Sequence, residues 1–441
     1  DLHSFPTRRS SDLHIVAVSF AGPASEPDPA LRHAREFLQK HPLIDGHNDL
    51  PSVVREHGDV VAYDLRKTTP GDTDLARLRQ GGVGVQFWSV FIPSTDEVRK
   101  AGFARVQLEQ IDIARRIIDR YPEALELALT ADEIEQANRT GRIASLLGAE
   151  GGHAIENSLG ALRTYYHLGV RYMTLTHLKN NDWADSATDA PRHGGLTRFG
   201  QEVVREMNRL GMLVDLSHVS PGTMNDVLDI AEAPVIFSHS NAKALTPHPR
   251  NVPDEVLRRL PVNGGVVMAS FISAFTVKAP IYATWEAGFA KASGDIKFGD
   301  ERYDEARAKY SKQYPEPRAS IADVADHIEH IRRVAGIDHV AIGSDFFGTP
   351  ADMASGLEDV SRYPLVFAEL IRRGWSDEEL IKLSRANLLR VLRSAERAAA
   401  EIQRTRVASY RTIEELDQGR KPPQPSIWRS EERRVGKECR S

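Results

Sequence analysis

Near its start the chain carries the stretch Leu43-Ile44-Asp45-Gly46-His47-Asn48-Asp49-Leu50-Pro51, in which an apolar strand runs into two side chains that can bind a metal ion. Residues two positions apart in an extended strand project from the same face. His47 and Asp49 can therefore point at one site, and imidazole and carboxylate are common metal ligands. Taken alone, the stretch is equally a strand end with a capping Asp and a surface His. The metal interpretation gains weight because similar patterns recur along the chain.

Apolar runs of strand length alternate with helical patterns through the body of the sequence. Uninterrupted apolar strands separated by helices are typical of a parallel sheet covered by helices. Eight such strands predict an α/β fold, a (β/α)8 barrel of the TIM type, rather than an open doubly wound sheet. No Gly-x-Gly-x-x-Gly turn follows the first strand, which argues against a dinucleotide-binding fold. After the run at Leu43, the expected strands are 83–90, 143–148, 170–176, 212–218, 234–239, 265–271 and 339–345.

Helical periodicity and capping signals predict the helices between these strands. A capping box is expected at Thr130-Ala131-Asp132-Glu133, and Ser220-Pro221 has the composition of a helix start. A long polar segment, 273–319, interrupts the pattern after the seventh strand. We expect it to be a helical insertion that covers the barrel mouth or makes a dimer contact. The other expected helices are 28–39, 103–120, 158–168, 201–210, 321–335, 359–373 and 377–400.

The two ends of the sequence differ in character from the body. Residues 1–13 and 428–441 are polar, rich in Arg and without periodicity, and are interpreted as a non-native leader and tail. We expect a leader and N-terminal helix over 14–40, a metal-dependent catalytic barrel over 41–400 and a C-terminal wrap over 401–427. The apolar run within the leader is either the remnant of a secretory signal, which implies a periplasmic or secreted protein, or an unstructured segment of a cytoplasmic one.

Composition excludes several kinds of chemistry. The single cysteine, Cys439, excludes disulfides, a thiolate nucleophile in the body and Cys-ligated zinc. A formal net charge of −5 gives no indication of a nucleic-acid partner. No apolar run approaches the roughly 20 residues of a transmembrane helix. A metal site in this chain therefore has to use His and carboxylate side chains, and 16 His residues are available.

Most of the expected strands end in a side chain that can bind a metal ion or a proton. The C-terminal ends of barrel strands form one mouth, so such residues converge although they lie far apart in the sequence. Simple polar capping would explain any one of them, but three strands end in His, and Asp, Ser or Asn would cap as well. The set comprises His47, Asp49, Glu150, His177, His218, His239 and Asp345.

This set offers more ligands than one tetrahedral zinc ion, which takes three or four. Two ions about 3.5–4 Å apart and bridged by a carboxylate accommodate it better. Glu150 is the natural bridge because its strand lies between the two ligand groups. We expect His47, Asp49 and Glu150 to hold one ion and Glu150, His218 and His239 to hold the other. A hydroxide between the ions would then be the nucleophile.

Eight motifs, in this order, closely resemble those of the membrane (renal-type) dipeptidases, metallopeptidases of the amidohydrolase-like barrels. The motifs are LIDGHNDLP, GAEGGHAIE, LTHLKNNDWADS, GGLTRFG, LVDLSH, FSHSNAKAL, HPRNVPD and GSDF, and the resemblance covers about residues 42–392. It implies zinc-dependent hydrolysis of the peptide bond of small dipeptides, with the five ligands named above around two zinc ions. His and carboxylate sites also accept Mn²⁺ or Co²⁺.

The resemblance also implies roles for three further positions. His177 would polarise the scissile carbonyl and stabilise the oxyanion. Arg250 would pair with the free carboxylate of the dipeptide. Asp345 would carry a proton from the water to the leaving amine. The expected catalytic residues are thus Glu150, His177 and Asp345, with Arg250, His177 and Asp345 contacting substrate. Simpler alternatives are a structural His at the barrel rim, a surface Arg and a carboxylate that orients a ligand His.

Departures from the family pattern limit what the resemblance implies. The chain has Asp345-Phe346-Phe347-Gly348 where the family commonly has Asp-Phe-Asp-Gly, and its seventh strand lacks the Asn and Tyr of the mammalian members. The substrate side-chain preference therefore cannot be carried over. We expect a bacterial enzyme without a glycolipid anchor. The alternatives are a related barrel hydrolase acting on D-amino-acid-containing peptides or β-lactam amides, and a ligand-binding barrel without catalysis.

Overall fold

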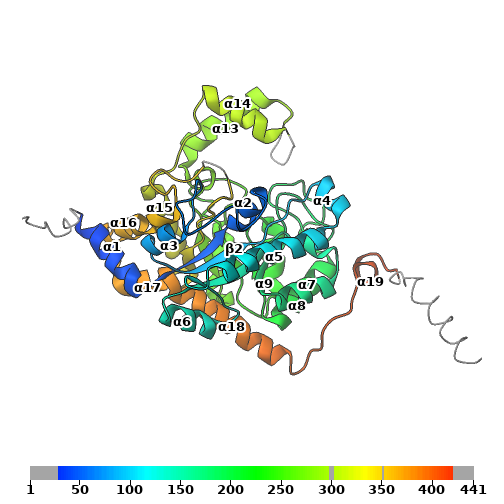
Figure 1. Cartoon of the computed structure of the whole chain (residues 1–441). Helices are drawn as coiled ribbons and strands as arrows, with labels where there is room; N and C mark the ends of the chain where they lie inside the picture. The colour runs from blue at the N-terminus through cyan, green and yellow to red at the C-terminus, as the bar shows by residue number, and fades with distance from the viewer. Residues whose placement is uncertain (1–27, 297–301, 350–351, 421–441) are drawn as a thin grey trace, which may run out of the picture.

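The computed structural model describes residues 28–296, 302–349 and 352–420 and contains a closed ring of parallel strands (Figure 1). Each strand of the ring pairs with two neighbours, and the ring closes where β2 pairs with β4. The predicted (β/α)8 barrel is therefore confirmed. The ring consists of β1 (Leu43–Asn48), β2 (Val83–Ser89), β4 (Ile143–Glu150), β5 (Val170–Thr174), β6 (Leu213–Asp215), β7 (Ile236–Phe237), β8 (Val266–Ala269) and β9 (Val340–Ile342).

A ninth strand, β3 (Leu125–Leu127), lies outside the ring. It pairs with the first three residues of β4, whereas β5 pairs with β4 from Leu147 onward. β3 therefore extends one side of β4 beyond the point where the barrel neighbour stops. The sequence does not predict it, because three residues are too few for a period-two pattern to be recognised.

Helices surround the ring and pack their apolar faces on the outer side of the strands. The helices of this layer and its connections are α1 (Pro29–Lys40), α2 (Leu50–Glu56), α3 (Leu75–Gln80), α4 (Asp96–Ala101), α5 (Phe103–Arg120), η1 (Gly152–Ile155), α7 (Leu159–His167), α8 (Arg198–Leu210), α9 (Pro221–Ile230), α10 (Asp254–Leu257), α11 (Leu260–Asn263), α15 (Ile321–Ala335), η2 (Ile337–His339), η3 (Val360–Arg362), α16 (Tyr363–Arg372) and α19 (Ile413–Asp417).

The predicted helix starts have different outcomes. Ser220 caps α9 by accepting a hydrogen bond from the Thr223 amide, and Pro221 occupies the first turn, as expected. Thr130 caps α6 (Ala131–Arg139) by accepting from the Glu133 amide. The Glu133 carboxylate, however, accepts from the Leu129 amide instead of the Thr130 amide. Only one half of the predicted capping box forms, since the carboxylate binds the amide one residue earlier.

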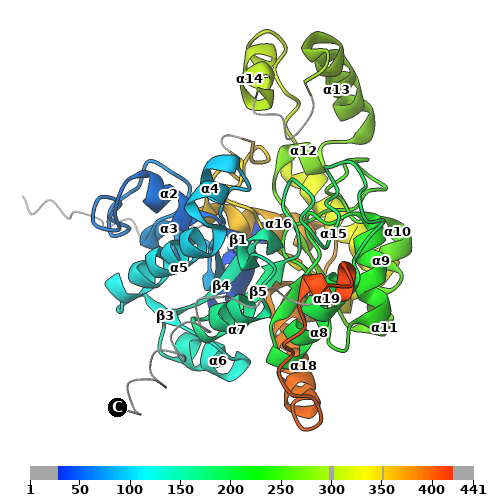
Figure 2. The same ribbon diagram turned by 90° about the vertical axis from the view of Figure 1, so that its right-hand side faces the viewer.

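The inside of the ring is apolar, and two helices close its N-terminal end. α6 and α18 (Asn387–Ile402) lie below the barrel in the view of Figure 2. Their apolar side chains form one cluster with the side chains that fill the ring. This cluster includes Ile44, Val85, Leu146, Ile236 and Met268 from the strands, Ile134 and Ala137 from α6, and Leu388, Leu389 and Leu392 from α18.

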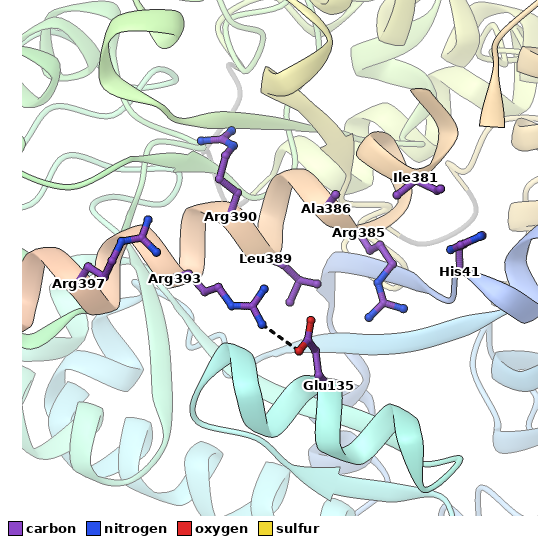
Figure 3. Close-up of a pocket in the computed structure, with 9 residues that line it drawn as sticks. All are labelled: His41, Glu135, Ile381, Arg385, Ala386, Leu389, Arg390, Arg393 and Arg397. Atoms are coloured by element: carbon purple, nitrogen blue, oxygen red, sulfur yellow. Dashed lines mark ion pairs between the residues drawn. The ribbon is translucent and has the colours of Figure 1, made fainter. Parts of the chain in front are cut away.

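The last predicted helix, 377–400, is interrupted. α17 (Asp377–Ile381) passes into a π-helical turn at Lys382–Ala386, and α18 follows directly (Figure 3). A π-helical turn widens the helix by one residue and changes the direction of the side chains that follow it. The hydrophobic period of the sequence does not reveal this shift.

The predicted insertion after the seventh barrel strand is helical. It contains α12 (Ser273–Thr276), α13 (Ala279–Ser293) and α14 (Tyr303–Gln313). α13 and α14 project from the barrel at the end opposite to α6 and α18 (Figures 1 and 2). Trp285, Phe289 and Tyr303 form a small cluster of their own between these two helices. The insertion is thus a separate layer above the C-terminal end of the barrel.

The predicted non-native ends, 1–13 and 428–441, and the leader up to residue 27 lie outside the described residues. In the part of the chain that the structure describes, no helix combines the length and the apolar character needed to cross a bilayer.

Candidate metal centre

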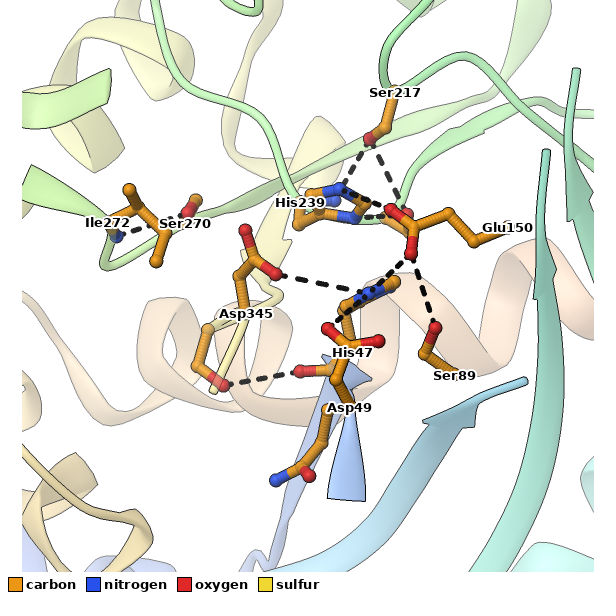
Figure 4. Close-up of polar contacts among 12 residues, drawn as sticks. His47, Asp49, Ser89, Glu150, Ser217, His239, Ser270, Ile272 and Asp345 are labelled. Atoms are coloured by element: carbon orange, nitrogen blue, oxygen red, sulfur yellow. Dashed lines mark hydrogen bonds and ion pairs between the residues drawn. The ribbon is translucent and has the colours of Figure 1, made fainter. Parts of the chain in front are cut away.

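Six of the seven polar side chains predicted at the strand ends meet at the C-terminal end of the barrel. Figure 4 shows five of them, His47, Asp49, Glu150, His239 and Asp345. His47 lies within β1 and Glu150 is the last residue of β4. His177, His218, His239 and Asp345 follow their strands by two or three residues instead of ending them. The expected strands 212–218 and 339–345 are therefore too long.

Backbone conformation explains why these strands stop early. His218 and Asp345 have φ angles of +67° and +71°, which residues other than glycine rarely adopt. This conformation turns the chain out of the sheet, so that the side chain can face the barrel axis. Left-handed residues of this kind cost free energy and cluster at functional sites. Hydrogen bonds from the Asp345 amide to the His47 carbonyl and from the Asp49 amide to the Phe346 carbonyl, 3.2 and 2.9 Å long, hold this turn against β1.

His47, Asp49 and Glu150 form the first group of candidate ligands. Nε2 of His47 lies 3.2 Å from Oδ2 of Asp49 and 3.5 Å from Oε2 of Glu150. The three ligand atoms lie within 4.8 Å of one another. The side chain of His47 is completely buried, so the group faces the interior of the mouth.

Glu150, His218 and His239 form the second group. Oε1 of Glu150 lies 2.9 Å from Nε2 of His218 and 3.3 Å from Nε2 of His239. The two imidazole nitrogens lie 3.0 Å apart. Glu150 thus presents one carboxylate oxygen to each group, which is the arrangement that a bridging ligand needs. Asp345 forms a third group of possible ligands with His47 and His239, and its Oδ1 lies 3.9 Å from Nε2 of His47.

Two hydroxyl groups fix the orientation of ligand imidazoles. Nδ1 of His47 lies 2.8 Å from the Tyr172 hydroxyl, which itself donates to the Gly46 carbonyl at 3.2 Å. A hydroxyl has one proton, so Tyr172 accepts from His47, and Nδ1 of that imidazole carries its hydrogen. In the neutral form of His47 the lone pair is then on Nε2, the atom that faces the two carboxylates. This is the tautomer that binds a metal ion through Nε2.

The same arrangement occurs at His239. Nδ1 of His239 lies 2.8 Å from the Ser238 hydroxyl, which donates to Oδ2 of Asp215 at 2.6 Å. Thr174 also donates to Oδ2 of Asp215, so this buried carboxylate acts as an acceptor. Ser238 therefore accepts from His239 and leaves the Nε2 lone pair free. A chain of hydrogen bonds thus extends from the ligand imidazole into the barrel.

The electrostatics of the cluster favour a bound cation. Burial would raise the pKa of Glu150, but His47, His218 and His239 lower it well below its ordinary value. Burial lowers the pKa of both His218 and His239 well below the usual range, so these imidazoles are neutral. Burial would lower the pKa of His47 as well, but Tyr172, Asp49 and Glu150 raise it well above its ordinary value. The carboxylates thus draw positive charge to this point, and neutral imidazoles are present to bind it.

Unpaired polar atoms agree with a missing partner. Oδ1 of Asp49 and Nδ1 of His218 are buried and have no hydrogen-bond partner among the described residues. Buried polar atoms without a partner are rare and call for an explanation. The free Oδ1 of Asp49 and the convergent Nε2 atoms fit a site that holds a divalent cation through nitrogen and carboxylate ligands, whereas Nδ1 of His218 is on the far side of its ring from that site.

His177 and Arg250 lie beside the cluster on the side of the mouth. Nε2 of His177 lies 3.9 Å from Oε1 of Glu150, and its side chain is 15% exposed, more than that of any ligand described above. The Arg250 guanidinium is almost completely buried over the Phe275 ring, and Nη2 donates to the His239 carbonyl at 3.4 Å. Nη1 of Arg250 has no partner among the described residues. Burial lowers the pKa of Arg250 to about 10.

A cavity of about 570 Å³ adjoins the segment that carries Arg250. Residues 187–189 and Pro247, His248 and Pro249 line one side, and Tyr282, Ala283 and Glu286 of α13 line the other. The insertion therefore contributes a wall to a cavity at the catalytic end of the barrel. Its predicted role as a dimer contact stays a prediction.

Sequence reasoning did not identify the residues that orient the ligands. Tyr172 reads as one apolar residue of a buried strand, and nothing local indicates that its hydroxyl reaches a residue 125 positions away. A signal did exist for Asp215 and Ser238. A carboxylate within an apolar strand has to find hydrogen-bond donors, and Leu-Val-Asp-Leu-Ser-His places one three residues before a candidate ligand.

Comparison with known proteins identifies what the chain is similar to. A model of the membrane dipeptidase family (peptidase family M19) matches residues 31–406. Dipeptidase verJ of Clonostachys rogersoniana is 42% identical over 389 residues, which cover 86% of this chain and 90% of that protein. Dipeptidase 3 of Mus musculus is 41% identical over 377 residues, which cover 84% of this chain and 68% of that protein. The expectation of a bacterial source has no support from these fungal and mammalian relatives.

Solved structures share the fold. The probable dipeptidase PvdM from Pseudomonas aeruginosa superimposes with a TM-score of 0.75 and 24% sequence identity. The superposition covers 85% of this chain and all of that one. The barrel of the present chain therefore has a counterpart of the same architecture among experimentally determined structures.

Proposed function

Because the chain belongs to the membrane dipeptidase family (peptidase family M19) and is a metallo-dipeptidase, we propose that it hydrolyses dipeptides with a free C-terminal carboxylate at a centre of two zinc ions. The observation that carries the proposal is the position of Glu150. Its two carboxylate oxygens face two separate groups of ligands, His47 with Asp49 and His218 with His239. Two divalent ions bound there would lower the pKa of a water molecule between them and polarise the scissile carbonyl.

Arg250 holds the substrate carboxylate in this proposal. Its guanidinium is buried, carries a free Nη1 and has no ion pair with a described residue. A planar guanidinium matches the geometry of a carboxylate, and low polarity strengthens the pair. A dipeptide anchored there has its only peptide bond one residue from its charged end, so the anchor fixes the position of that bond relative to the cluster. The anchor thus favours substrates with a free C-terminal carboxylate.

His177 stabilises the negative charge that develops on the carbonyl oxygen. Burial lowers the pKa of His177, so its imidazole is neutral and donates one N–H group. Its partial exposure at the mouth allows a substrate carbonyl to approach. A donor fixed before the reaction stabilises the transition state more than the substrate, because charge on oxygen grows as the tetrahedral centre forms.

Asp345 transfers the proton. Burial raises the pKa of Asp345 well above its ordinary value, and the carboxylates of Asp49 and Glu150 add to the effect, while His47 opposes it. A carboxyl group with a raised pKa takes up and gives off a proton close to neutral pH. Asp345 accepts a proton from the attacking water as the C–O bond forms. It donates that proton to the amine nitrogen as the C–N bond breaks, so two amino acids leave.

Metal content and a substrate panel test the proposal together. The full chain is dialysed exhaustively and its bound metal is measured, and we expect two divalent ions per chain, with zinc supporting turnover. Fewer than two ions would contradict the dinuclear centre. The panel contains an L,L dipeptide, its C-terminal amide, an L,D dipeptide and an intact β-lactam.

The amide arm tests Arg250 specifically. We expect the free-carboxylate dipeptide to be hydrolysed with a higher kcat/KM than its amide, and we expect Arg250→Met to remove most of this difference by raising KM. Equal loss on both substrates would mean that Arg250 does not bind the carboxylate. Faster turnover of the L,D dipeptide or of the β-lactam would assign the chain to the alternative substrate classes.

A further inference from the structure

A second pocket, of about 530 Å³, lies at the N-terminal end of the barrel, away from the metal centre (Figure 3). α18 and the π-helical turn before it form one side, Glu135 of α6 lies opposite, and His41 precedes β1 at the edge. The lining consists of His41, Glu135, Ile381, Arg385, Ala386, Leu389, Arg390, Arg393 and Arg397. Nothing in the proposed peptidase chemistry uses these residues.

The charges in this pocket do not balance. Its lining contains four Arg side chains and one carboxylate, that of Glu135. Glu135 pairs with Arg393, with Oε2 2.9 Å from Nη2, and Asp132 also pairs with Arg393 at 3.2 Å. Arg397 contacts only the Ser394 hydroxyl among the described residues. The excess positive charge therefore belongs to the other Arg residues.

The hydrogen bonds of Arg390 explain why a guanidinium lies at its position, whereas the contacts of Arg385 do not. Arg390 donates to the carbonyls of Gly264 and Asp338 at 2.6 Å each, and so connects α18 to the end of α11 and to η2. Arg385 makes one long hydrogen bond, 3.5 Å from Nη2 to Oδ1 of Asn138, and forms no ion pair with a described residue. Burial lowers the pKa of Arg385, which Glu135 opposes and Arg393 reinforces. A half-buried guanidinium without a counter-charge is costly unless an anion binds it.

We propose that this pocket binds a small phosphorylated organic molecule, with Arg385 as the residue that holds its phosphate. A phosphate monoester carries about −1.5 to −2 charges at neutral pH, which suits several guanidinium groups around one carboxylate. Ile381, Ala386 and Leu389 provide an apolar floor for the organic part of the ligand. The cavity volume is within the roughly 300–1,000 Å³ of small-molecule sites. This inference does not depend on the proposed peptidase function.

Calorimetric titration of the metal-loaded full chain tests the site, with inorganic phosphate and fructose 1,6-bisphosphate as probes at matched ionic strength. We expect the bisphosphate to bind at least about tenfold more tightly than inorganic phosphate, because its second phosphate and sugar reach further lining residues. Equal affinities, or heats no larger than those of added sodium chloride, would overturn the proposal.

Four substitutions locate the binding. Arg385→Gln should weaken bisphosphate binding at least about tenfold, whereas Arg105→Gln, the same change of charge on an exposed side chain of α5, should leave it unchanged. Glu135→Gln should strengthen binding severalfold, because it removes the only carboxylate of the lining. Unchanged affinity in both Arg385→Gln and Glu135→Gln would refute the site. Loss of binding in Arg250→Gln would place the phosphate at the catalytic mouth instead.

Discussion

The two ends of this barrel are built from the same strands but carry different kinds of side chain. At the N-terminal end, the side chains that point into the ring are apolar, and α6 and α18 cover them. At the C-terminal end, six strands or the residues just after them present imidazole and carboxylate groups to one point. The difference shows that packing and chemistry are separated along the barrel axis, as parallel-strand barrels generally separate them.

The two ends also differ in how completely their groups are satisfied. The cluster at the C-terminal end contains buried polar atoms without partners, on Asp49, His218 and Arg250. Two of its residues, the candidate ligand His218 and the candidate acid Asp345, have positive φ. At the N-terminal end, the plug formed by the side chains of α6 and α18 that pack against the ring is apolar and needs no partners, and the incompletely paired Arg385 lies outside this plug, in the neighbouring pocket. The strain at the C-terminal end is tolerated because the N-terminal end and the helical layer supply the stability of the fold.

The largest expected effect concerns the residue that joins the two ligand groups. Glu150→Gln keeps the shape of the side chain but removes the charge that faces three imidazoles. We expect activity to fall by more than the roughly 10²–10⁴-fold that a single general acid or base contributes, because both ions lose a ligand. Metal analysis after dialysis should find fewer than two ions per chain.

Glu206→Gln is the matched control for this change. Glu206 is a buried carboxylate on α8 that binds Arg163 and Arg209, far in the fold from the ligand groups. Its substitution should reduce stability and leave metal content intact. Retention of both ions in Glu150→Gln would show that the two ligand groups do not depend on this residue.

A smaller loss is expected when the metal ligands are kept and the proton carrier is removed. Asp345→Asn should lower kcat by about 10²–10⁴-fold, the usual contribution of general acid–base catalysis, with two ions still bound. Steady-state kinetics and metal analysis on the same sample measure both quantities. Asp352→Asn serves as the control and should keep its activity, because Asp352 is a half-buried carboxylate that accepts from the Ala274 amide and contacts no ligand group. Loss of metal from Asp345→Asn would make Asp345 a ligand instead.

A substitution at the N-terminal end should lower the stability of the fold and leave the metal site unchanged. Leu388 of α18 is completely buried in the plug, and Leu388→Ala should cost about 2–5 kcal/mol of the free energy of unfolding. Urea unfolding measures this cost, with Val262→Ala, at a side chain that is 94% exposed, as the control expected to change little. Metal content and kcat/KM should remain those of the unchanged chain. A marked fall in metal affinity in folded Leu388→Ala would mean that the two ends are coupled.

Much of the difference between the two ends of the barrel can be predicted from the sequence, because it follows from local residue patterns. Apolar strands alternating with helices give the barrel, and His47, Glu150 and His239 stand directly at or after such strands. What the sequence does not give is where each strand stops. β6 and β9 end three residues before His218 and Asp345, only isolated hydrogen bonds continue beyond them, and both residues have positive φ. That conformation is set by contacts with other strands, which no local pattern contains.

The groups that orient the ligands were missed for the same physical reason. The Tyr172 hydroxyl matters only because β5 places it opposite β1, and its ring fits only because residue 148 is glycine. A Cβ atom at Gly148 would lie 2.0 Å from Cζ of Tyr172. A complementary pair of this kind, a small residue on one strand and a ring on the next, becomes recognisable only when the neighbouring strands are known.

The smallest of these effects tests that orientation directly. Tyr172→Phe removes the acceptor for the Nδ1 hydrogen of His47 and keeps the ring that fills the barrel. We expect a loss of about 10–100-fold in metal affinity or activity, which is typical when a group that orients a metal ligand is removed. Competition with a chelator measures the affinity independently of turnover. Tyr165→Phe removes a buried hydroxyl that donates to the Ala154 carbonyl at 2.7 Å, but it touches no ligand. Tyr172→Phe should reduce stability at least as much as Tyr165→Phe, because it leaves the Nδ1 hydrogen of His47 as well as one buried carbonyl without a partner. If chelator competition gave the same metal affinity for both variants, the Tyr172 hydroxyl would not orient His47, and its ring would only fill the barrel. The metal site at the C-terminal end would then depend on hydrogen bonds from the barrel interior no more than the apolar packing at the N-terminal end does.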